Sequence, residues 1–279
     1  MDYFNYNGKI YKEGSQIIGA DNRGLKYGDG LFETMKMIKG RLIFEDEHFA
    51  RLWKGMKVLQ FEIPKHFSVE LLQQEIKSLA QKNGHEAGAR IRLNIVRGDG
   101  GLYDAKNHHP NYIIQTLPLA AENGHWNSNG LVLGIYEAVK KSCDIISNIK
   151  HNNYLTFVLA ALTAKNEKWN DAIVLNVSGR ICETTIANVF IVKDNVVYTP
   201  PLQEGCVAGI MRKMVIKGLQ NGEQAVVEKE LTIDDLFAAD EVFLTNSIYD
   251  IRWVQCIGNV LYKNNVTKKI FNDIIQTIS

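Results

Sequence analysis

The feature of the sequence that most restricts its fold is a succession of short alternating segments joined by tight turns. Residues 1–13 alternate around Asn7-Gly8, and residues 31–44 repeat the pattern around Lys39-Gly40. Both patterns predict β-hairpins, because glycine readily adopts the positive φ angles that tight hairpin turns require. The chain does not show the strand–helix alternation of a parallel, doubly wound sheet. We therefore expect a fold of the α+β class, rich in hairpins.

Helical spacing follows the second hairpin. A helix is predicted to open at Asp46, and Val69–Asn83 predicts an amphipathic helix that ends at Gly84. Asp144–Ile149 predicts a short apolar strand. Other strands are predicted at 90–96, 111–116, 131–138, 172–177, 180–183, 188–193, 196–199, 241–245 and 252–262. Other helices are predicted at about 152–167, 209–220 and 232–237, with a final helix near the C-terminus.

A polar, glycine-containing and aperiodic stretch at residues 120–130 is the best linker candidate. It separates a smaller N-terminal α+β domain, residues 1–119, from a larger C-terminal domain, residues 131–279. On this division the C-terminal domain carries Lys150.

Composition narrows the classes of partner. The 279 residues are 46% hydrophobic and 23% charged, with a formal net charge of +1. A near-neutral chain without a basic stripe predicts no nucleic-acid partner. No apolar run approaches the roughly 20 residues that cross a bilayer, and the first residues lack the pattern of a signal peptide. We therefore expect a cytoplasmic protein without a membrane partner.

The four cysteines, Cys143, Cys182, Cys206 and Cys256, are scattered and form no CxxC pair. We interpret them as reduced, mostly buried thiols, with a role as metal ligands or as a nucleophile as the alternative. His108-His109 lies in a loop without metal-ligand spacing, so no metal site is predicted. The glycine-rich stretches fit neither the dinucleotide fingerprint nor the P-loop.

Lys150 occupies an unfavourable position in the segment SNIKHNNYL. It precedes a predicted helix for which Asn152 and Asn153 are candidate caps, and a helix N-terminus disfavours a positive charge by roughly 0.3–1 kcal/mol. One interpretation is a lysine that extends its ammonium group to solvent. The other is an amine whose pKa is lowered by burial and by the helix end, which makes it a nucleophile able to form a Schiff base.

A lysine that binds pyridoxal 5′-phosphate (PLP) needs a carboxylate at the pyridine nitrogen, donors for the phosphate and a trap for the substrate carboxylate. Glu183, beside Thr184 at a strand end, is the candidate carboxylate, although in isolation an ion pair at the hairpin end explains it better. The glycine loop before Ile210 and Met211 offers backbone amides to a phosphate. Arg51, beside the apolar stripe of its helix, offers a bidentate contact, with a solvated arginine as the alternative.

Six segments in order form a larger pattern: RGLKYGDGLFET (23–34), EHFARL (47–52), IKHNNYL (149–155), ETTIANVF (183–190), GIMR (209–212) and DEVFLTNS (240–247). At these separations the chain resembles the class IV aminotransferase family, the fold-type IV PLP enzymes. That family includes branched-chain aminotransferases, D-amino acid aminotransferases and aminodeoxychorismate lyases. The resemblance implies a two-domain fold like that of D-amino acid aminotransferase, with hairpin-rich mixed sheets, flanking helices and a homodimer whose N-terminal loops complete the partner's site.

The resemblance also implies roles for individual residues. Lys150 would hold PLP as a Schiff base and move the proton between the substrate's Cα and the cofactor's C4′ carbon. Glu183 would pair with the ring nitrogen and keep it protonated, and Tyr154 would face the phenolic oxygen. The other residues implied in cofactor binding are Arg51, Thr184, Ile210, Met211, Asn246 and Ser247.

The subgroup signals conflict. Thr34 follows the glutamate of GLFET as in lyases and D-amino acid enzymes, whereas branched-chain enzymes usually have glycine there. The loop RGDGGLY (97–103), which contains Tyr103, resembles the lyase loop, but Leu102 stands where lyases commonly have arginine. Tyr154 and Phe32 favour a transaminase of apolar L-amino acids.

Arg97 is the nearest remaining candidate for binding the substrate carboxylate, with a structural arginine at a strand end as the alternative. Together with Phe32 and Tyr103 it forms the predicted substrate site. We expect a PLP-dependent aminotransferase that moves an amino group between an amino acid, branched-chain or apolar, and a 2-oxo acid. The alternative is an aminodeoxychorismate lyase, which forms 4-aminobenzoate and pyruvate. The third hypothesis is a PLP-binding protein without turnover.

Overall fold

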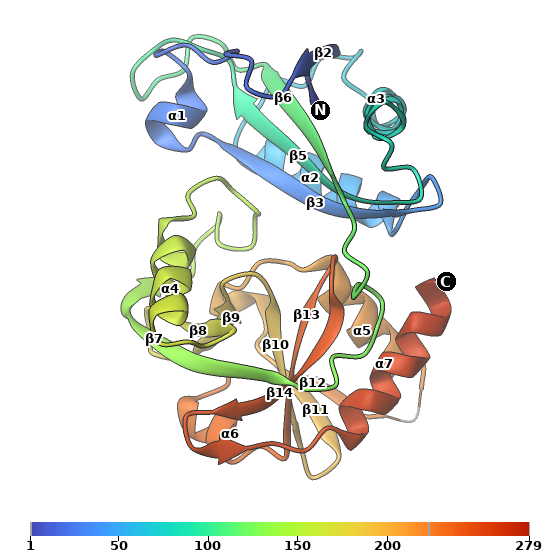
Figure 1. Cartoon of the computed structure of the whole chain (residues 1–279). Helices are drawn as coiled ribbons and strands as arrows, with labels where there is room; N and C mark the ends of the chain where they lie inside the picture. Colours follow the sequence, from blue (N-terminus) through green and yellow to red (C-terminus); the bar gives the residue numbers. More distant parts are fainter. Residues whose placement is uncertain (1, 223, 279) are drawn as a thin grey trace. The chain divides into compact units, whose positions relative to one another are not determined.

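The computed structural model describes residues 2–222 and 224–278, with side chains as far as residue 274, and it divides into two compact units (Figure 1). The N-terminal unit extends to Ala121 and also takes in Ile149–Asn153. The C-terminal unit contains Glu122–Asn148 and continues from Tyr154. Among the described residues, no helix combines the length and the apolar character that crossing a lipid bilayer requires.

The segment that carries Lys150 belongs to the N-terminal unit, whereas we expected it in the C-terminal domain. Its backbone pairs with strand β3 (Gly30–Ile38): the Phe32 amide donates to the Lys150 carbonyl at 2.8 Å, and Leu31 forms an antiparallel bridge with His151. Because these partners lie far apart in the chain, no local pattern indicates the pairing.

One antiparallel sheet of six strands forms the N-terminal unit, in the order β2-β1-β6-β5-β3-β4. Its other strands are β1 (Tyr3–Tyr6), β2 (Lys9–Lys12), β4 (Arg41–Leu42), β5 (Gly88–Arg97) and β6 (Pro110–Pro118). The two hairpins predicted from the turns are confirmed, and Asn7, Gly8, Lys39 and Gly40 all have positive φ angles.

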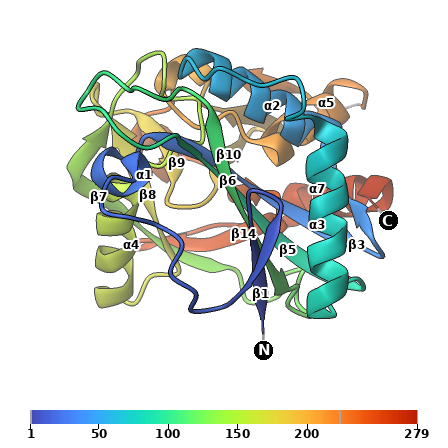
Figure 2. The ribbon, with the colours of Figure 1, turned by 90° about the horizontal axis from the view of Figure 1, so that it is seen from above.

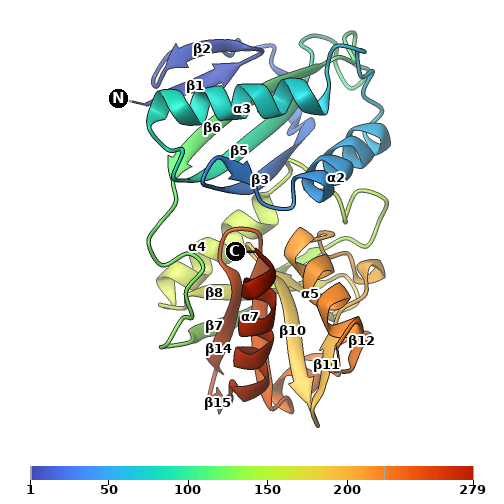
Figure 3. The same ribbon diagram turned by 90° about the vertical axis from the view of Figure 1, so that its right-hand side faces the viewer.

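Helices α2 (Glu45–Val58) and α3 (Val69–Asn83) pack on this sheet, α2 against β3 and α3 against β1 and β6 (Figure 3). Their buried apolar side chains recur at helical spacing: Phe49, Leu52, Met56, Leu72, Ile76 and Leu79. Burial of each large apolar side chain stabilises the unit by about 1.5–3 kcal/mol before chain entropy is counted. The short helix α1 (Arg23–Tyr27) was not predicted.

A mixed sheet of nine strands forms the C-terminal unit, in the order β12-β11-β10-β13-β14-β7-β8-β9, with β15 beside β14. Its strands are β7 (Leu131–Lys141), β8 (Asp171–Asn176), β9 (Ile181–Thr184), β10 (Asn188–Lys193), β11 (Val196–Thr199), β12 (Val226–Glu228), β13 (Glu241–Asn246), β14 (Asp250–Ile257) and β15 (Val260–Leu261). The sheet curls, because β9 at one end also contacts β10. The α+β class is therefore confirmed; β12 was not predicted.

Helix α4 (Leu155–Asn166) lies along β7 and β8 (Figure 2) and buries Phe157, Ala160 and Ala164. Helices α5 (Ile210–Gln220) and α7 (Asn265–Ile278) contact each other and β13, and the short α6 (Ile233–Phe237) begins at a capping box.

The predicted strand 144–149 is wrong, because this segment forms turns. The Asp144 carboxylate accepts from the Ile146 amide and from the Ser147 hydroxyl, at 3.0 and 2.9 Å, so side chains compete with strand pairing. The predicted caps are also wrong: α4 begins at Leu155 with Tyr154 at the N-cap position and no side-chain cap bond. The helix-end argument for Lys150 therefore has no support.

Candidate functional site

Lys150 lies beside an aromatic ring in the N-terminal unit. Its Nζ is 4.6 Å from the centroid of Phe32, whose side chain is buried at 5% exposure. The guanidinium carbon of Arg92 is 4.0 Å from the centroid of the same ring. Phe32 was predicted to contact substrate, and the structure brings it together with Lys150 and with a second cation that sequence reasoning did not identify.

Arg51 is turned into the N-terminal unit rather than into solvent. Its Nε donates to Glu33 Oε1 at 2.8 Å and its Nη2 donates to Glu33 Oε2 at 2.5 Å, a side-on bidentate pair. His48, one helical turn before Arg51 on α2, places Nδ1 2.8 Å from the same Oε2. Burial opposes ionisation of Glu33, but the charge of Arg51 and these hydrogen bonds outweigh it and lower the pKa of Glu33 to about 2.

Arg97, the predicted substrate-carboxylate residue, makes structural contacts. Nε donates to Asp29, Nη1 donates to the Gln60 carbonyl and contacts His108, and Nη2 donates to the Leu59 carbonyl. These contacts use most of its N–H groups, so the geometry favours the structural alternative for Arg97.

Arg23 fastens the loop that contains Tyr103, the third predicted substrate residue. Its Nε donates to Asp29 at 2.8 Å, and its two Nη atoms donate to carbonyls of the loop, among them that of Tyr103 at 3.3 Å. The Tyr103 side chain is 90% exposed, and its ring centroid is 5.8 Å from that of Tyr27.

In the C-terminal unit Glu183 is buried and paired with a lysine. Its Oε1 accepts from Lys141 Nζ, and both of its oxygens lie 3.1 Å from the Val207 amide nitrogen. Burial lowers the proton affinity of Lys141, but the Glu183 carboxylate more than offsets this and raises the pKa of Lys141 above its ordinary value. Lys141 is thus held as an ammonium ion and is unsuited to act as a nucleophile.

The loop before α5 is fixed by two asparagines. Asn148 Nδ2 donates to the carbonyls of Leu202 and Cys206, both at 2.7 Å, and Asn188 Nδ2 donates to the Val207 carbonyl at 2.9 Å. A Cβ on Gly209 would lie 1.9 Å from Asn188 Oδ1, so a side chain at this helix start would displace the Asn188 amide from the Val207 carbonyl.

Gly209 is also the N-cap of α5 and makes no side-chain cap bond. The helix therefore begins with the amides of Ile210 and Met211, which have no acceptor within the helix and carry the positive end of its dipole. A rigid loop and a helix N-terminus of this kind fit an anionic group such as phosphate.

Three further predicted cofactor residues have local roles. The Thr184 hydroxyl donates to the Ala187 carbonyl at 3.2 Å and accepts from the Ala187 amide. Asn246 Oδ1 accepts from the amides of Ile248 and Tyr249, at 3.0 and 2.8 Å, and so closes the turn that contains Ser247. Tyr154 packs on Phe157, with 4.7 Å between ring centroids. Their contacts with a cofactor stay predictions.

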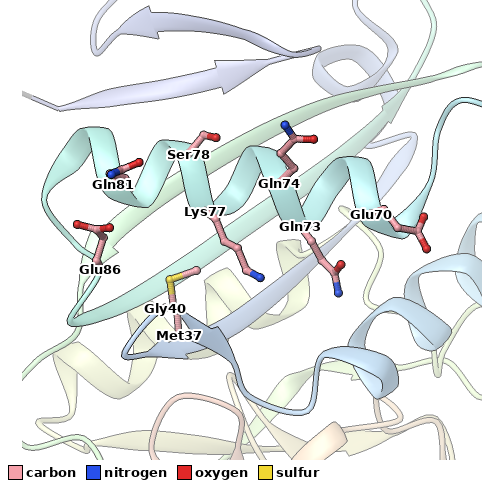
Figure 4. Close-up of a pocket in the computed structure, with 9 residues that line it drawn as sticks. All are labelled: Met37, Gly40, Glu70, Gln73, Gln74, Lys77, Ser78, Gln81 and Glu86. Atoms are coloured by element: carbon pink, nitrogen blue, oxygen red, sulfur yellow. The ribbon is translucent and has the colours of Figure 1, made fainter.

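The structure contains two cavities that do not include the predicted catalytic residue. A cavity of about 460 Å³ in the N-terminal unit runs along α3, and its wall includes Gln73 and Lys77 of that helix and Met37 of β3 (Figure 4). A second, of about 110 Å³, lies in the C-terminal unit and includes Asn246 and Asp171 in its wall. Neither is lined by Lys150. Among the residues described, no group of three His, Cys, Asp or Glu could hold a metal ion.

Cys182 and Cys206 are not reactive thiolates. All four cysteines are free thiols. Burial raises the pKa of Cys206 to about 12 and raises that of Cys182 well above its ordinary value. A role for either as a nucleophile is therefore not supported.

Sequence reasoning missed Glu33, His48, Arg92 and Lys141. Glu33 had a visible signal, since it is a charged residue within a strand of apolar, mostly buried positions, whereas Lys141 follows exposed or half-buried residues of β7 and had none. His48 stands three residues before Arg51, on the same face of α2, and this spacing also could have been noticed. Arg92 stands in a strand that alternates buried and less buried residues, and only the pairing of β5 with β3 brings it near Phe32.

Comparison with known proteins identifies the class. The family model for class IV amino-transferases matches residues 30–257, so the chain belongs to the class IV aminotransferase family. Enzymes of this family depend on PLP. The fold-family prediction is thereby confirmed.

Individual relatives carry two different activities. An aminodeoxychorismate lyase of Vibrio harveyi is 33% identical over 239 residues, which cover 85% of this chain and 86% of the lyase. A putative branched-chain-amino-acid aminotransferase of Methanocaldococcus jannaschii is 31% identical over 276 residues, which cover 96% and 94%. Among solved structures, the branched-chain amino acid aminotransferase of Escherichia coli superposes with a TM-score of 0.88 at 26% identity, covering 100% of this chain and 95% of that one.

Proposed function

We propose that the chain is a PLP-dependent aminotransferase that moves an amino group between an apolar or branched-chain amino acid and a 2-oxo acid. The observation that carries the proposal is the family match, together with the near-complete coverage of an aminotransferase relative, 96% of this chain and 94% of that protein. The amine Lys150, the carboxylate Glu183 and the anion-binding start of α5 are the residues that this chemistry requires.

The chain's own residues then divide the work. Bound PLP supplies an electron-withdrawing ring that stabilises negative charge at the substrate's Cα. Lys150 would hold the cofactor covalently through Nζ, and the same nitrogen, as a free amine, would accept and return the proton that the reaction moves at the substrate's Cα. Glu183 would accept a hydrogen bond from the ring nitrogen, since Oε2 has the capacity: a carboxylate oxygen accepts more than the one amide donor described for it.

Arg51, the amides of Ile210 and Met211, and Ser247 would be the donors to the phosphate, as the family resemblance implies. Arg51 presents a guanidinium group that Glu33 holds from one edge, and the two amides point outward from a helix N-terminus. Each of these groups suits an anion such as phosphate.

Arg92 replaces Arg97 as the proposed partner of a substrate carboxylate. The N–H groups of Arg97 bind Asp29 and backbone carbonyls, whereas the Arg92 guanidinium lies against Phe32, the ring that also contacts Lys150. An arginine against the ring that Lys150 also contacts suits a substrate with a second carboxylate, such as a dicarboxylic 2-oxo acid acting as amino acceptor.

Aminodeoxychorismate lyase activity is the second candidate. A lyase relative is 33% identical over 85% of this chain, and Thr34 follows Glu33 in the GLFET segment as it does in lyases. A PLP-binding protein without turnover is the third candidate and has only the family match in its favour.

One set of measurements separates the three. A transaminase changes its visible absorbance with an L-amino acid and recovers the original spectrum with 2-oxoglutarate. A lyase releases pyruvate and 4-aminobenzoate from aminodeoxychorismate without any amino acceptor. A yellow protein that responds to neither favours binding without turnover. An amino-acid panel in the first assay also defines the side-chain preference and the stereochemistry.

A homodimer is part of the proposal. Helix α4 is apolar on both faces: it buries Phe157 and Ala160 inward, while Leu155, Val158 and Leu162 are 69%, 49% and 53% exposed at i, i+3 and i+7. A helix that is apolar all round is normally covered, and a second copy is the partner expected from the family. Sedimentation of Leu162→Glu against wild type tests this; an unchanged dimer would exclude α4 from the interface. The expected cytoplasmic location stays a prediction.

A further inference from the structure

The Glu33–His48–Arg51 cluster is more elaborate than an arginine needs in order to be buried. Glu33 takes Nε and Nη2 of Arg51 at 2.8 and 2.5 Å, which fixes the plane of the guanidinium and the direction of its remaining N–H bonds. The Glu33 side chain is 2% exposed and the Arg51 side chain 12% exposed. The pair joins α2 to β3, and it sits in the same unit as Lys150.

His48 fixes the carboxylate in turn. Burial lowers the pKa of His48, and the positive charges of Arg51 and Lys150 lower it further, against the raising effect of Glu33. The ring is therefore neutral at pH 7, and because Nδ1 faces a carboxylate at 2.8 Å, Nδ1 carries the proton and donates.

The same tautomer leaves His48 Nε2 as an acceptor. The side chain is 0% exposed, and among the described residues Nε2 has no hydrogen-bond partner. A buried acceptor without a donor is destabilising, so an apolar side chain would serve packing better than this imidazole does. The gain that offsets this cost is the hydrogen bond to Glu33.

We propose that Glu33 and His48 are positioning residues that hold the Arg51 guanidinium in the orientation that binds the cofactor's phosphate. The inference rests on the proposed function, since it assigns these residues to the phosphate of PLP. Glu33 is itself an anion and would repel a phosphate that reached it, so its role is to orient Arg51, not to contact the ligand. The competing explanation is a purely structural ion pair that attaches α2 to the sheet.

The two explanations differ in what a small change at His48 does to phosphate recognition. His48→Leu removes the Nδ1 donor, whereas His48→Asn has nearly the same size and shape as the leucine and retains a donor near the position of Nδ1. The readout is the ratio of the dissociation constants of pyridoxal, which lacks phosphate, and PLP, measured on purified full-length protein stripped of cofactor. Thermal unfolding of each variant is measured alongside.

In the wild type, PLP is expected to bind much more tightly than pyridoxal. His48→Leu should reduce that ratio about tenfold, the lower end of what loss of an orienting residue costs in metal sites, by weakening PLP binding while pyridoxal binding is nearly unchanged. His48→Asn should restore most of the ratio. In an Arg51→Ala background, His48→Leu should cause no further reduction, because the group that it orients is gone.

Three results would overturn the proposal. If His48→Leu weakens both ligands equally, or lowers only the melting temperature, the cluster is structural. If His48→Leu still reduces the ratio in the Arg51→Ala background, His48 acts other than through Arg51. If the wild type binds pyridoxal as tightly as PLP, or binds neither, the proposed PLP site itself fails, a result distinguishable from the others because it needs no variant.

Discussion

Each unit buries a carboxylate of the candidate site against a cation, and the two pairs differ in what they leave for a ligand. In the N-terminal unit, both oxygens of Glu33 are taken by Arg51, and His48 adds a third hydrogen bond. In the C-terminal unit, Glu183 binds Lys141 through Oε1, and the contact described for Oε2 is one backbone amide. Glu33 therefore serves another side chain, whereas Glu183 keeps capacity for a ligand donor.

The same comparison separates the two lysines. Lys141 lies against the Glu183 carboxylate, which raises its pKa and keeps the proton on Nζ. Lys150 lies instead against the face of Phe32, the ring that also contacts Arg92. A nucleophilic amine must lose its proton readily, so the ion pair with Glu183 makes Lys141 unsuited to covalent chemistry.

The largest effect is expected from Lys150→Ala. Turnover should fall by roughly four orders of magnitude or more, as it does when a catalytic nucleophile is removed, while the fold persists. Borohydride reduction of the wild type, followed by peptide mass spectrometry, should place the pyridoxyl label on residue 150 and leave residue 141 unlabelled. A label on Lys141, or appreciable activity in Lys150→Ala, would reverse the comparison between the lysines.

Glu183→Gln should have the next largest effect. The amide cannot stabilise a protonated ring nitrogen as a carboxylate does, and we expect kcat to fall by about 10²–10³, the size of effect seen when one preorganised electrostatic partner is lost. Cofactor should stay bound, because the phosphate donors are unchanged, and dialysis followed by absorbance measurement checks this. A Lys141→Gln variant is the matched control. If both variants lose the cofactor, the ion pair between Glu183 and Lys141 is required for folding of the loop around Val207.

Arg51→Ala should weaken the binding of PLP and leave kcat of the cofactor-saturated enzyme nearly unchanged. Loss of one charge-assisted contact with phosphate is expected to cost about 1.5–3 kcal/mol, which is roughly 10- to 150-fold in the dissociation constant of PLP. Saturating PLP should restore most of kcat. Unchanged retention would place Arg51 in a structural pair with Glu33 only.

Local patterns were sufficient wherever the neighbours that decide a structure lie within a few residues. Helix α3 has the bounds predicted, because the Ser68 hydroxyl accepts from the Leu71 amide at its start and Gly84 adopts the left-handed conformation at its end. The segment 144–149 failed for a related reason: Asp144 and Ser147 form a side-chain network that an apolar pattern does not reveal.

Long-range contacts explain the parts of the site that could not be predicted. The position of Arg51 beside an apolar stripe left an inward and a solvated orientation open, and its partner Glu33 depends on the packing of α2 on β3. The choice between Arg97 and Arg92 depends on Asp29, which approaches Arg97 from 68 positions away, and on the pairing of β5 with β3. Side-chain type and motif order identify the family, whereas only the fold shows which arginine makes structural contacts and which one lies near Lys150's ring partner Phe32.

The smallest effect expected is on stability at mildly acid pH, and it tests the neutral state of His48. The folded-state pKa of His48 is lowered from 6.5, so below pH 6.5 the unfolded chain binds a proton that the folded chain does not. Stability should therefore fall, by at most about 1.4 kcal/mol per pH unit from this one group, as pH drops below 6.5. Glu33, whose pKa is lowered to about 2, reduces stability only below pH 4.5, where Glu33 of the unfolded chain begins to take up a proton.

Denaturant unfolding of wild type and His48→Asn at pH 7.5, 6.5 and 5.5 separates the two groups. The asparagine cannot titrate, so this variant should show a flatter dependence of stability on pH between pH 6.5 and 5.5. If the free energy of unfolding depends on pH equally in both proteins, His48 is protonated in the folded state and is not the neutral tautomer that donates from Nδ1.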